Sequence, residues 1–258
     1  MNGTEKRLNC SCEQCALSQF CLARDLLGPE KAHFNSVISS RRLLERGQNL
    51  FMVGDRFYAL YILHSGSAKS YILSEGGEQQ ITGFHLPGEL IGIDGLDTYT
   101  HAYGIEILET SSVCELPMAE LDRLIVGSWA LRHRFLSLIG RALVDEKQML
   151  LTLGKLRAEQ RFARFLLDMS HRYSLLGTSP TEFNLSMPRN DIANYLGLVV
   201  ETISRIIRRF QDDGIIQVKR RWVRILNLEK LQMFVTQPAA PGTVLATNLE
   251  DMSSEVAH

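Results

Sequence analysis

The sequence predicts an α+β protein, in which an antiparallel β jelly roll is followed by a long helix and a compact C-terminal unit. Three observations predict this fold. Between about Leu43 and Pro117, short apolar runs alternate with frequent glycines, as in small antiparallel sheets. From Met118 to about Lys155, the apolar spacing changes to 3.5 residues. After Gly154, shorter helical patterns and a basic hairpin pattern continue to about Phe234.

The composition is that of a folded protein with a sizeable core. The chain has 258 residues, of which 45% are hydrophobic and 22% are charged. Its 28 Lys and Arg residues nearly balance 29 Asp and Glu residues, which excludes a polycation. No apolar run has the length of a membrane span, and the N-terminal stretch MNGTEKRLNCSC lacks the apolar core of a secretory signal. We therefore expect a cytoplasmic protein that does not bind a membrane.

Composition and periodicity divide the chain into five expected segments. They are a cysteine-rich segment at 1–30, the jelly roll at 31–117, the long helix at 118–156, a C-terminal unit at 157–235 and a disordered tail at 236–258. Within the jelly roll, Tyr58–Leu63 and Lys69–Leu73 have the pattern of strands. The glycines between Ser74 and Glu78 suit the hairpin loop that follows.

The long helix carries the pattern of a coiled-coil seam. Its members alternate at spacings of three and four, and they are Leu136, Ile139, Leu143, Glu146, Leu150 and Leu153. This pattern predicts a homodimer. In a parallel two-fold seam, Glu146 meets its symmetry mate, and like charges oppose pairing. The alternative is an ordinary polar seam residue that sets the register at some cost in stability.

The segment from Met187 to Phe210 has the layout of a helix-turn-helix. Pro188 suits a helix start and Gly197 suits the turn. The second helix places Val200, Ile203, Ile207 and Phe210 on one face. Polar side chains that can bond to base edges or phosphates lie outside this apolar face, and they are Glu201, Thr202, Ser204, Arg205 and Arg208.

A basic hairpin follows the second helix. The stretch Ile215–Ile225 predicts a two-stranded wing whose cations, Lys219, Arg220, Arg221 and Arg224, face the phosphate backbone of DNA. From Glu201 to Arg224 there are seven Lys and Arg residues against three Asp and Glu residues. The alternative, an amphipathic surface helix with solvated charges, does not explain why these features occur in this order. We therefore predict a winged helix-turn-helix that binds double-stranded DNA.

Four of the five cysteines, Cys10, Cys12, Cys15 and Cys21, lie close together near the N-terminus, and the fifth is Cys114. Three closely spaced thiols and one remote thiol suit zinc or an iron–sulfur cluster. A third possibility is that Cys114 is only a small buried apolar residue. Spacing alone leaves all three open.

Four separated stretches together resemble one family. They are Cys12–Cys21, Glu78–Gly92, Glu109–Pro117 and Asn194–Arg205. With these stretches the chain resembles the Crp/Fnr superfamily of bacterial transcription regulators, and within it the oxygen-sensing Fnr (fumarate and nitrate reduction regulator) group. The resemblance implies a jelly roll of the cyclic-nucleotide-binding type.

The resemblance also implies a function. Cys12, Cys15, Cys21 and Cys114 would hold a [4Fe-4S] cluster, and Cys10 would be spare. The cluster would promote dimerisation and DNA binding under anaerobic conditions and would be lost on oxidation. The expected DNA site is a palindrome of TTGAT and ATCAA half-sites. The turn from Glu75 to Gln80 would contact RNA polymerase, as in an activator, and no enzyme activity is expected.

Cyclic AMP is the competing ligand within this superfamily. A bound phosphate favours an arginine, but the chain has no arginine between Arg56 and Arg123. Where the cyclic-AMP branch has an Arg-Ser pair, this chain has Thr98–Ala102. His101 in this stretch is expected to be an ordinary surface or turn residue. We therefore expect no cyclic nucleotide, and the remaining alternatives are a zinc-based or thiol-based regulator that does not sense oxygen through a cluster.

Overall fold

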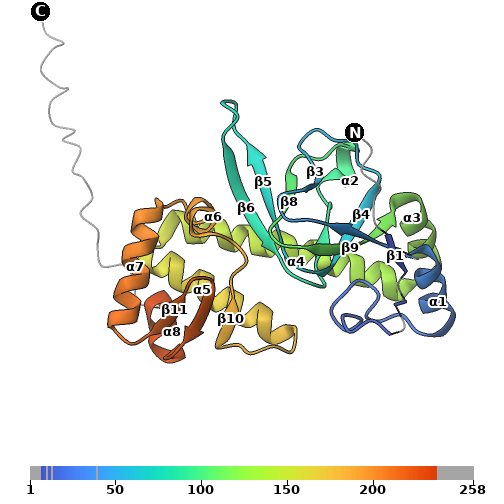
Figure 1. Cartoon of the computed structure of the whole chain (residues 1–258). Helices are drawn as coiled ribbons and strands as arrows, with labels where there is room; N and C mark the ends of the chain where they lie inside the picture. The colour runs from blue at the N-terminus through green and yellow to red at the C-terminus, as the bar shows by residue number, and fades with distance from the viewer. Residues whose placement is uncertain (1–6, 10, 13, 39, 237–258) are drawn as a thin grey trace, which may run out of the picture.

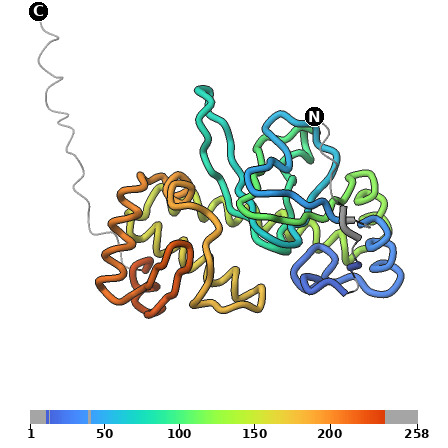
Figure 2. The backbone as a smooth tube through the Cα atoms, viewed as in Figure 1, coloured from blue at the N-terminus to red at the C-terminus, as the bar shows by residue number. Residues whose placement is uncertain are grey.

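The structure is a computed structural model that describes residues 7–9, 11–12, 14–38 and 40–236. Figures 1 and 2 show a β-rich N-terminal unit, a helical C-terminal unit and a long helix that spans both. Within the described residues, no helix combines the length and the apolar character needed to cross a membrane. Cys10 and the tail at 237–258 lie outside the described residues.

The N-terminal unit is a jelly roll of two antiparallel sheets. One sheet has the order β1-β2-β9-β4-β7 and the other has the order β3-β8-β5-β6. A shared core, which includes Leu63 of one sheet and Ile105 of the other, joins the two sheets. The strands are β1 (Arg7–Asn9), β2 (Ser40–Leu44), β3 (Asn49–Phe51), β4 (Ala59–Ser65), β5 (Ala68–Leu73), β6 (Gln79–His85), β7 (Leu90–Ile91), β8 (Gly104–Ile107) and β9 (Ser111–Pro117).

The predicted strands and hairpin of this unit are confirmed. Strand β4 contains the predicted stretch except for Tyr58, β5 contains all of Lys69–Leu73, and β5 pairs with β6 across the glycine-containing loop. Two helices accompany the sheets, α1 (Gly28–Val37) and the short α2 (Gly95–Thr98).

The prediction of a single long helix from 118 to 156 is wrong, because the first part of this range forms a separate helix. Two helices are present instead, α3 (Met118–Gly127) and α4 (Trp129–Lys155). Ser128 between them is extended, and its hydroxyl accepts a hydrogen bond from the Leu131 amide at 3.1 Å. A serine in this position is a typical N-cap, so α4 starts as a separate helix.

The C-terminal unit is a winged helix-turn-helix. Its elements are α5 (Ala158–Leu175), β10 (Glu182–Asn184), α6 (Arg189–Tyr195), α7 (Val200–Asp212), β11 (Ile216–Lys219), β12 (Trp222–Ile225) and α8 (Leu228–Thr236). The predicted wing is confirmed as the β11–β12 hairpin. Strand β10, which the sequence pattern did not indicate, pairs with β12 and completes a three-stranded sheet.

The two units share a core. Ile81, Phe84 and Leu108 of the jelly roll belong to the same buried cluster as the interior of the C-terminal unit. The ring of Phe84 contacts Phe165 of α5 and Tyr195 of α6, with centroid distances of 6.1 and 5.1 Å. Apolar burial therefore joins strand β6 to the helix-turn-helix.

Candidate functional site

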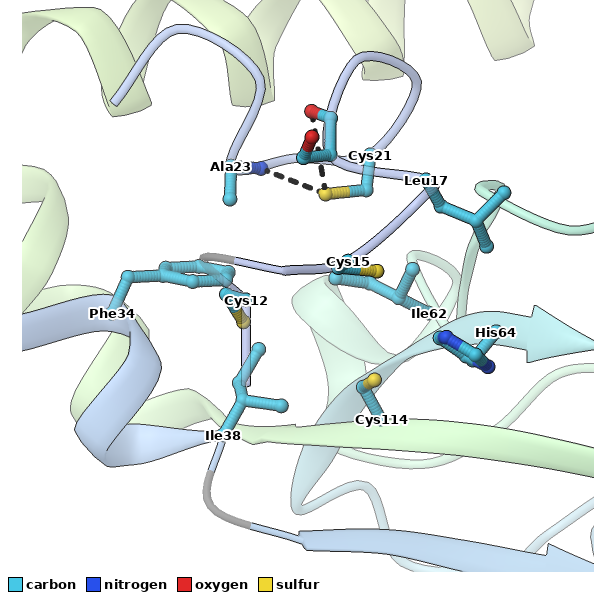
Figure 3. Close-up of a pocket in the computed structure, with 11 residues that line it drawn as sticks. Cys12, Cys15, Leu17, Cys21, Ala23, Phe34, Ile38, Ile62, His64 and Cys114 are labelled. Atoms are coloured by element: carbon cyan, nitrogen blue, oxygen red, sulfur yellow. Dashed lines mark hydrogen bonds between the residues drawn. The ribbon is translucent and has the colours of Figure 1, made fainter. Parts of the chain in front are cut away.

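The four cysteines proposed as ligands line one cavity. Cys12, Cys15 and Cys21 come from the loop between β1 and α1, and Cys114 comes from β9. Figure 3 shows the loop above the cavity and the strand below it. Side chains that are 93 residues or more apart in the chain are thus brought together, because β9 lies between β2 and β4 beneath the loop.

Short local hydrogen bonds shape the cysteine loop. The Ser18 amide donates to the carbonyl of Cys15 at 3.0 Å, and the Cys21 amide donates to the carbonyl of Leu17 at 3.1 Å. The amide of Cys12 donates to Oδ1 of Asn35 in α1 at 2.6 Å. These bonds turn the loop so that its three thiols reach the same cavity.

Burial governs the protonation of the Cys21 thiol. Its Sγ accepts a hydrogen bond from the Ala23 amide at 3.3 Å. Desolvation nevertheless raises the pKa of Cys21, and the nearby Cys15 thiol adds to the effect. Because the thiolate is the metal ligand, binding of a positive centre must displace a proton here.

His64 also lines the cavity, although the sequence reasoning did not single it out. It lies two residues after Ile62 on β4, so the alternation of a strand places both on the same face. Its Nδ1 is 3.3 Å from the Ser112 hydroxyl, and burial, followed by the charge of Arg41, lowers the pKa of His64. A neutral imidazole thus faces the cysteines at neutral pH.

The donor set suits an iron–sulfur cluster. Four thiols are the usual ligands of such clusters, and the apolar lining of Leu17, Phe34, Ile38 and Ile62 limits access of water. In the part of the chain that the structure describes, no three His, Cys, Asp or Glu side chains converge as ligands of a single metal ion. The cavity holds about 20 Å³, which is room for about one water molecule.

The loop rests on α4 and on a turn of the jelly roll. Arg134 of α4 donates a hydrogen bond from Nη2 to the carbonyl of Phe20 at 3.1 Å. A β carbon added to Gly88, whose φ is +90°, would lie 3.0 Å from the Cβ of Phe20. The residue that precedes Cys21 is therefore in contact with both structures.

The exposed face of α4 contains most of the predicted seam. The side chains of Leu136, Leu143 and Leu150 are 59%, 51% and 71% exposed, and Glu146 lies exposed among them. The other two predicted seam residues, Ile139 and Leu153, are half-buried within the chain. On an adjoining face, Leu131 and Phe135 pack into the core that contains Cys114. One helix thus lies between the cysteine site and an unpartnered apolar stripe.

Helix α7, the second helix of the helix-turn-helix, divides into a buried and an exposed face. Ile203, Ile206, Ile207 and Phe210 are buried, whereas Val200 is half-buried. Of the predicted DNA contacts, Glu201, Arg205 and Arg208 are exposed and Thr202 and Ser204 are half-buried. Nη2 of Arg205 donates to the Thr202 hydroxyl at 3.3 Å, which holds the guanidinium against the helix.

The turn before α7 is fixed by a single arginine. Gly197 has a φ of +61°, which favours glycine. Arg161 of α5 donates to the carbonyls of Leu153, Leu156 and Leu196 at 2.7 to 3.0 Å. It therefore joins the C-terminal ends of α4 and α6, where carbonyl groups lack helical partners.

His101 is not the surface residue that the sequence suggested. Its ring is buried and stacks on Phe51 with a centroid distance of 3.5 Å. Its Nδ1 lies 3.2 Å from Oδ1 of Asp94. The expectation was wrong because the aromatic neighbours come from a strand that is distant in sequence.

Comparisons with known proteins match both units. Residues 41–127 match the family model of the cyclic nucleotide-binding domain, and residues 160–234 match that of the Crp-like helix-turn-helix domain. The fumarate and nitrate reduction regulatory protein of Yersinia pestis is 41% identical over 227 residues, which cover 88% of this chain and 91% of that protein. The transcriptional activator protein FnrA of Stutzerimonas stutzeri is 41% identical over 216 residues, which cover 84% and 88%.

A solved structure supports the same relationship. FixK2 of Bradyrhizobium japonicum superposes with a TM-score of 0.70 at 25% identity, and the match covers 77% of this chain and 98% of FixK2. The predicted α+β fold class is therefore confirmed. Members of this family regulate transcription and are not enzymes. The chain belongs to the Crp/Fnr family of transcription regulators.

Proposed function

We propose that this chain is an oxygen-responsive transcription regulator of the cytoplasm, in which a [4Fe-4S] cluster held by Cys12, Cys15, Cys21 and Cys114 controls dimerisation and DNA binding. The observation that carries the proposal is that these four thiols line one apolar cavity. The Fnr-type names of relatives at 41% identity support it. When bound, the cluster supplies a redox centre that oxygen degrades.

The residues around the loop support a link between the cysteines and dimerisation. Phe20 of the cysteine loop accepts a hydrogen bond from Arg134 of α4 through its carbonyl. Another face of α4 carries the exposed leucines of the proposed homodimer seam. A change in the loop therefore acts on the helix whose pairing brings two recognition helices together.

The proposed DNA site is a palindrome of TTGAT and ATCAA half-sites. Glu201 can accept a hydrogen bond from cytosine, Arg205 can donate two bonds to guanine, and Ser204 can bond to a base or phosphate. The exposed positions of Glu201 and Arg205 on α7 support this assignment. A two-fold dimer presents two such helices to two half-sites.

RNA polymerase is the proposed second macromolecular partner. The turn from Glu75 to Gln80 is exposed, and the β5–β6 hairpin that contains it projects from the jelly roll in Figures 1 and 2. Such a projecting loop is available for contact with polymerase bound beside the regulator. Activation of transcription is the proposed result.

No cyclic nucleotide is part of the proposed mechanism. Between Arg56 and Arg123 the chain offers no arginine to a cyclic phosphate. His101, which stands in the corresponding stretch, is buried and in contact with Phe51 and Asp94.

Anaerobic reconstitution with iron and sulfide tests the proposal. We expect a brown protein with about four irons per chain that dimerises and binds a TTGAT/ATCAA duplex, and that loses colour, dimer and DNA binding in air. Cys114→Ser should abolish iron uptake, whereas the matched Cys10→Ser should not. A colourless protein with zinc or no metal, or equal DNA binding with and without air, would instead identify a zinc-based or thiol-based regulator.

A further inference from the structure

The side chain of Asn194 pairs with the backbone of strand β6. Its Nδ2 donates to the carbonyl of Gln79 at 2.9 Å, and its Oδ1 accepts from the amide of Ile81 at 2.6 Å. Strand β6 is the edge of the four-stranded sheet, so no strand among the described residues pairs with this side. The carboxamide therefore takes the place of a peptide group from a neighbouring strand.

Further polar contacts hold α6 along its length. Nε2 of Gln80 donates to the backbone carbonyl of Asn194 at 2.9 Å. At the other end of α6, the Asp191 carboxylate lies 2.9 Å from the buried Nζ of Lys69 in β5. Strands β5 and β6 thus bind the first and last turns of α6, which is the first helix of the helix-turn-helix.

This contact leaves the recognition helix free. Helix α7 follows α6 after one short turn, and its polar side chains Glu201, Arg205 and Arg208 remain exposed. In Figure 1, α7 lies on the side of the C-terminal unit that faces away from the jelly roll. The docked orientation is therefore compatible with DNA binding.

A dimeric DNA-binding protein depends on the separation of its two recognition helices. One additional base pair moves a half-site by about 3.4 Å and rotates it by about 35°. A C-terminal unit that turned freely on the jelly roll would follow such changes, whereas a fixed one would not. Fixing the orientation in advance also lowers the entropy lost when both half-sites are bound.

We propose that Asn194 is a positioning residue that fixes the helix-turn-helix on strand β6 and thereby sets the half-site spacing that the dimer accepts. Asn194 acts on DNA only through the orientation of α6 and α7. The inference rests on the proposed dimeric binding to a palindrome, but the docking itself has a readout that needs no DNA.

The first measurement is hydrogen exchange at the Ile81 amide in the full-length protein. This amide donates to Asn194 and lies on the open edge of the sheet, so its protection reports the docking directly. We expect Asn194→Ala to raise its exchange rate at least about tenfold, because a hydrogen bond of this kind is worth roughly one factor of ten. The exposed Asn190 on the same helix provides the matched control, Asn190→Ala, which should leave this amide protected.

The second measurement is affinity for a series of duplexes, with the reconstituted protein kept anaerobic. The duplexes carry two half-sites at the preferred spacing, or one base pair more or less, and a further duplex carries a single half-site. We expect Asn194→Ala to lose about tenfold in affinity at the preferred spacing and most of its preference for that spacing. Single-half-site binding should not change, and Asn194→Asp, which retains only the acceptor, should lie between.

The outcomes separate this inference from the proposed function. A palindrome that the parent protein does not bind would contradict the proposed function, while protection of Ile81 would still report the docking. Equal exchange of Ile81 in the parent and in Asn194→Ala would overturn the inference. The inference would also be overturned if Asn194→Ala kept the spacing preference. Tighter DNA binding by Asn194→Ala would overturn it too, because it would mean that docking on β6 inhibits DNA binding.

Discussion

Gly88 and Phe20 approach so closely that a β carbon on Gly88 would lie 3.0 Å from the Cβ of Phe20. Gly88 belongs to the turn between β6 and β7, and Phe20 directly precedes Cys21. The cysteine loop therefore contacts a turn of the jelly roll at a point where a side chain on residue 88 would be closely confined. Any displacement of the cysteine loop therefore changes the contact between Phe20 and this turn.

Substitution of Gly88 tests that contact. Gly88→Ala should lower the free energy of unfolding by about 1 kcal/mol for its φ of +90°, and by about 1 kcal/mol more for the close approach. Gly77 has a φ of +80° and open space around it, so Gly77→Ala is the matched control. Denaturant unfolding should show a larger loss of unfolding free energy for Gly88→Ala than for Gly77→Ala. Equal losses would show that Phe20 moves aside without cost.

Arg134 is expected to carry the effect of the loop to α4. Arg134→Gln removes the donor to the Phe20 carbonyl but leaves all cysteines in place. The variant should still take up iron, yet its dimer should dissociate at about tenfold higher protein concentration, as expected for one charged hydrogen bond. Analytical ultracentrifugation under anaerobic conditions measures this shift.

The exposed Arg141 supplies the control for charge alone. Arg141→Gln makes the same change of charge two turns further along α4 and should leave the dimer strength within about twofold, as for ordinary surface charges. If both variants dissociate equally, the link through Phe20 is excluded and only the net charge of the helix matters.

Glu146 is expected to weaken the dimer. It is exposed in the stripe of Leu143 and Leu150, where a parallel pairing places two carboxylates near each other. Glu146→Ala should therefore give dimers that persist in air, detectable by size-exclusion chromatography and DNA binding. A variant that remains monomeric and fails to bind DNA in air would rule out the repulsion.

His85 should make the protein less stable in acid. Burial, followed by the charge of Arg172, lowers the pKa of His85 to about 3. The unfolded chain binds a proton at this residue below pH 6.5, whereas the folded chain does not until about pH 3. Stability should thus fall by up to about 1.4 kcal/mol for each pH unit below 6.5.

A His85→Gln variant identifies this contribution. Its stability at neutral pH sets the baseline, and the slope between pH 6 and pH 4 should decrease by about one proton relative to the parent. An unchanged slope would assign the acid sensitivity to other groups. Among the residues that the structure describes, the buried Nε2 of His85 has no hydrogen-bond partner, so the glutamine also tests whether that unsatisfied atom lowers stability.

The ion pair between Glu89 and Arg172 should stabilise the contact between the units. Nη2 of Arg172 lies 2.8 and 2.9 Å from the two carboxylate oxygens of Glu89. Glu89→Gln should lower the free energy of unfolding by about 2 kcal/mol, since it leaves a mostly buried guanidinium without its nearest anion. Asp168→Asn, at an exposed carboxylate that also contacts Arg172, should lower it by less than about 0.5 kcal/mol.

Local pattern was sufficient to predict several elements of this fold, although not β10 or the division of the 118–156 helix. Strand alternation located β4 and β5, and the apolar face of Ile203, Ile207 and Phe210 located α7. The break at Ser128 was also present in the sequence, because glycine followed by serine is typical of a helix end followed by an N-cap. The regular apolar spacing on both sides concealed it.

Contacts between distant segments could not be predicted in this way. The hydrogen bonds from Arg134 to Phe20 and from Ile81 to Asn194 join residues 114 and 113 positions apart. No sequence periodicity or motif predicts these hydrogen-bonded pairs. Each side chain bonds to a backbone group, and every residue has such groups. The four cysteines were recognisable as a set only through resemblance, and their placement around one cavity required the fold.

The apolar contact of Ile81, Phe84 and Leu108 with the C-terminal unit limits how this protein can be divided. A fragment that ends after α4 would expose these three side chains to water and should aggregate. A chimaera that joins this jelly roll to the helix-turn-helix of another regulator would need a matching surface for all three. Engineering of new promoter specificity should therefore exchange side chains on α7 and leave the rest of the C-terminal unit in place.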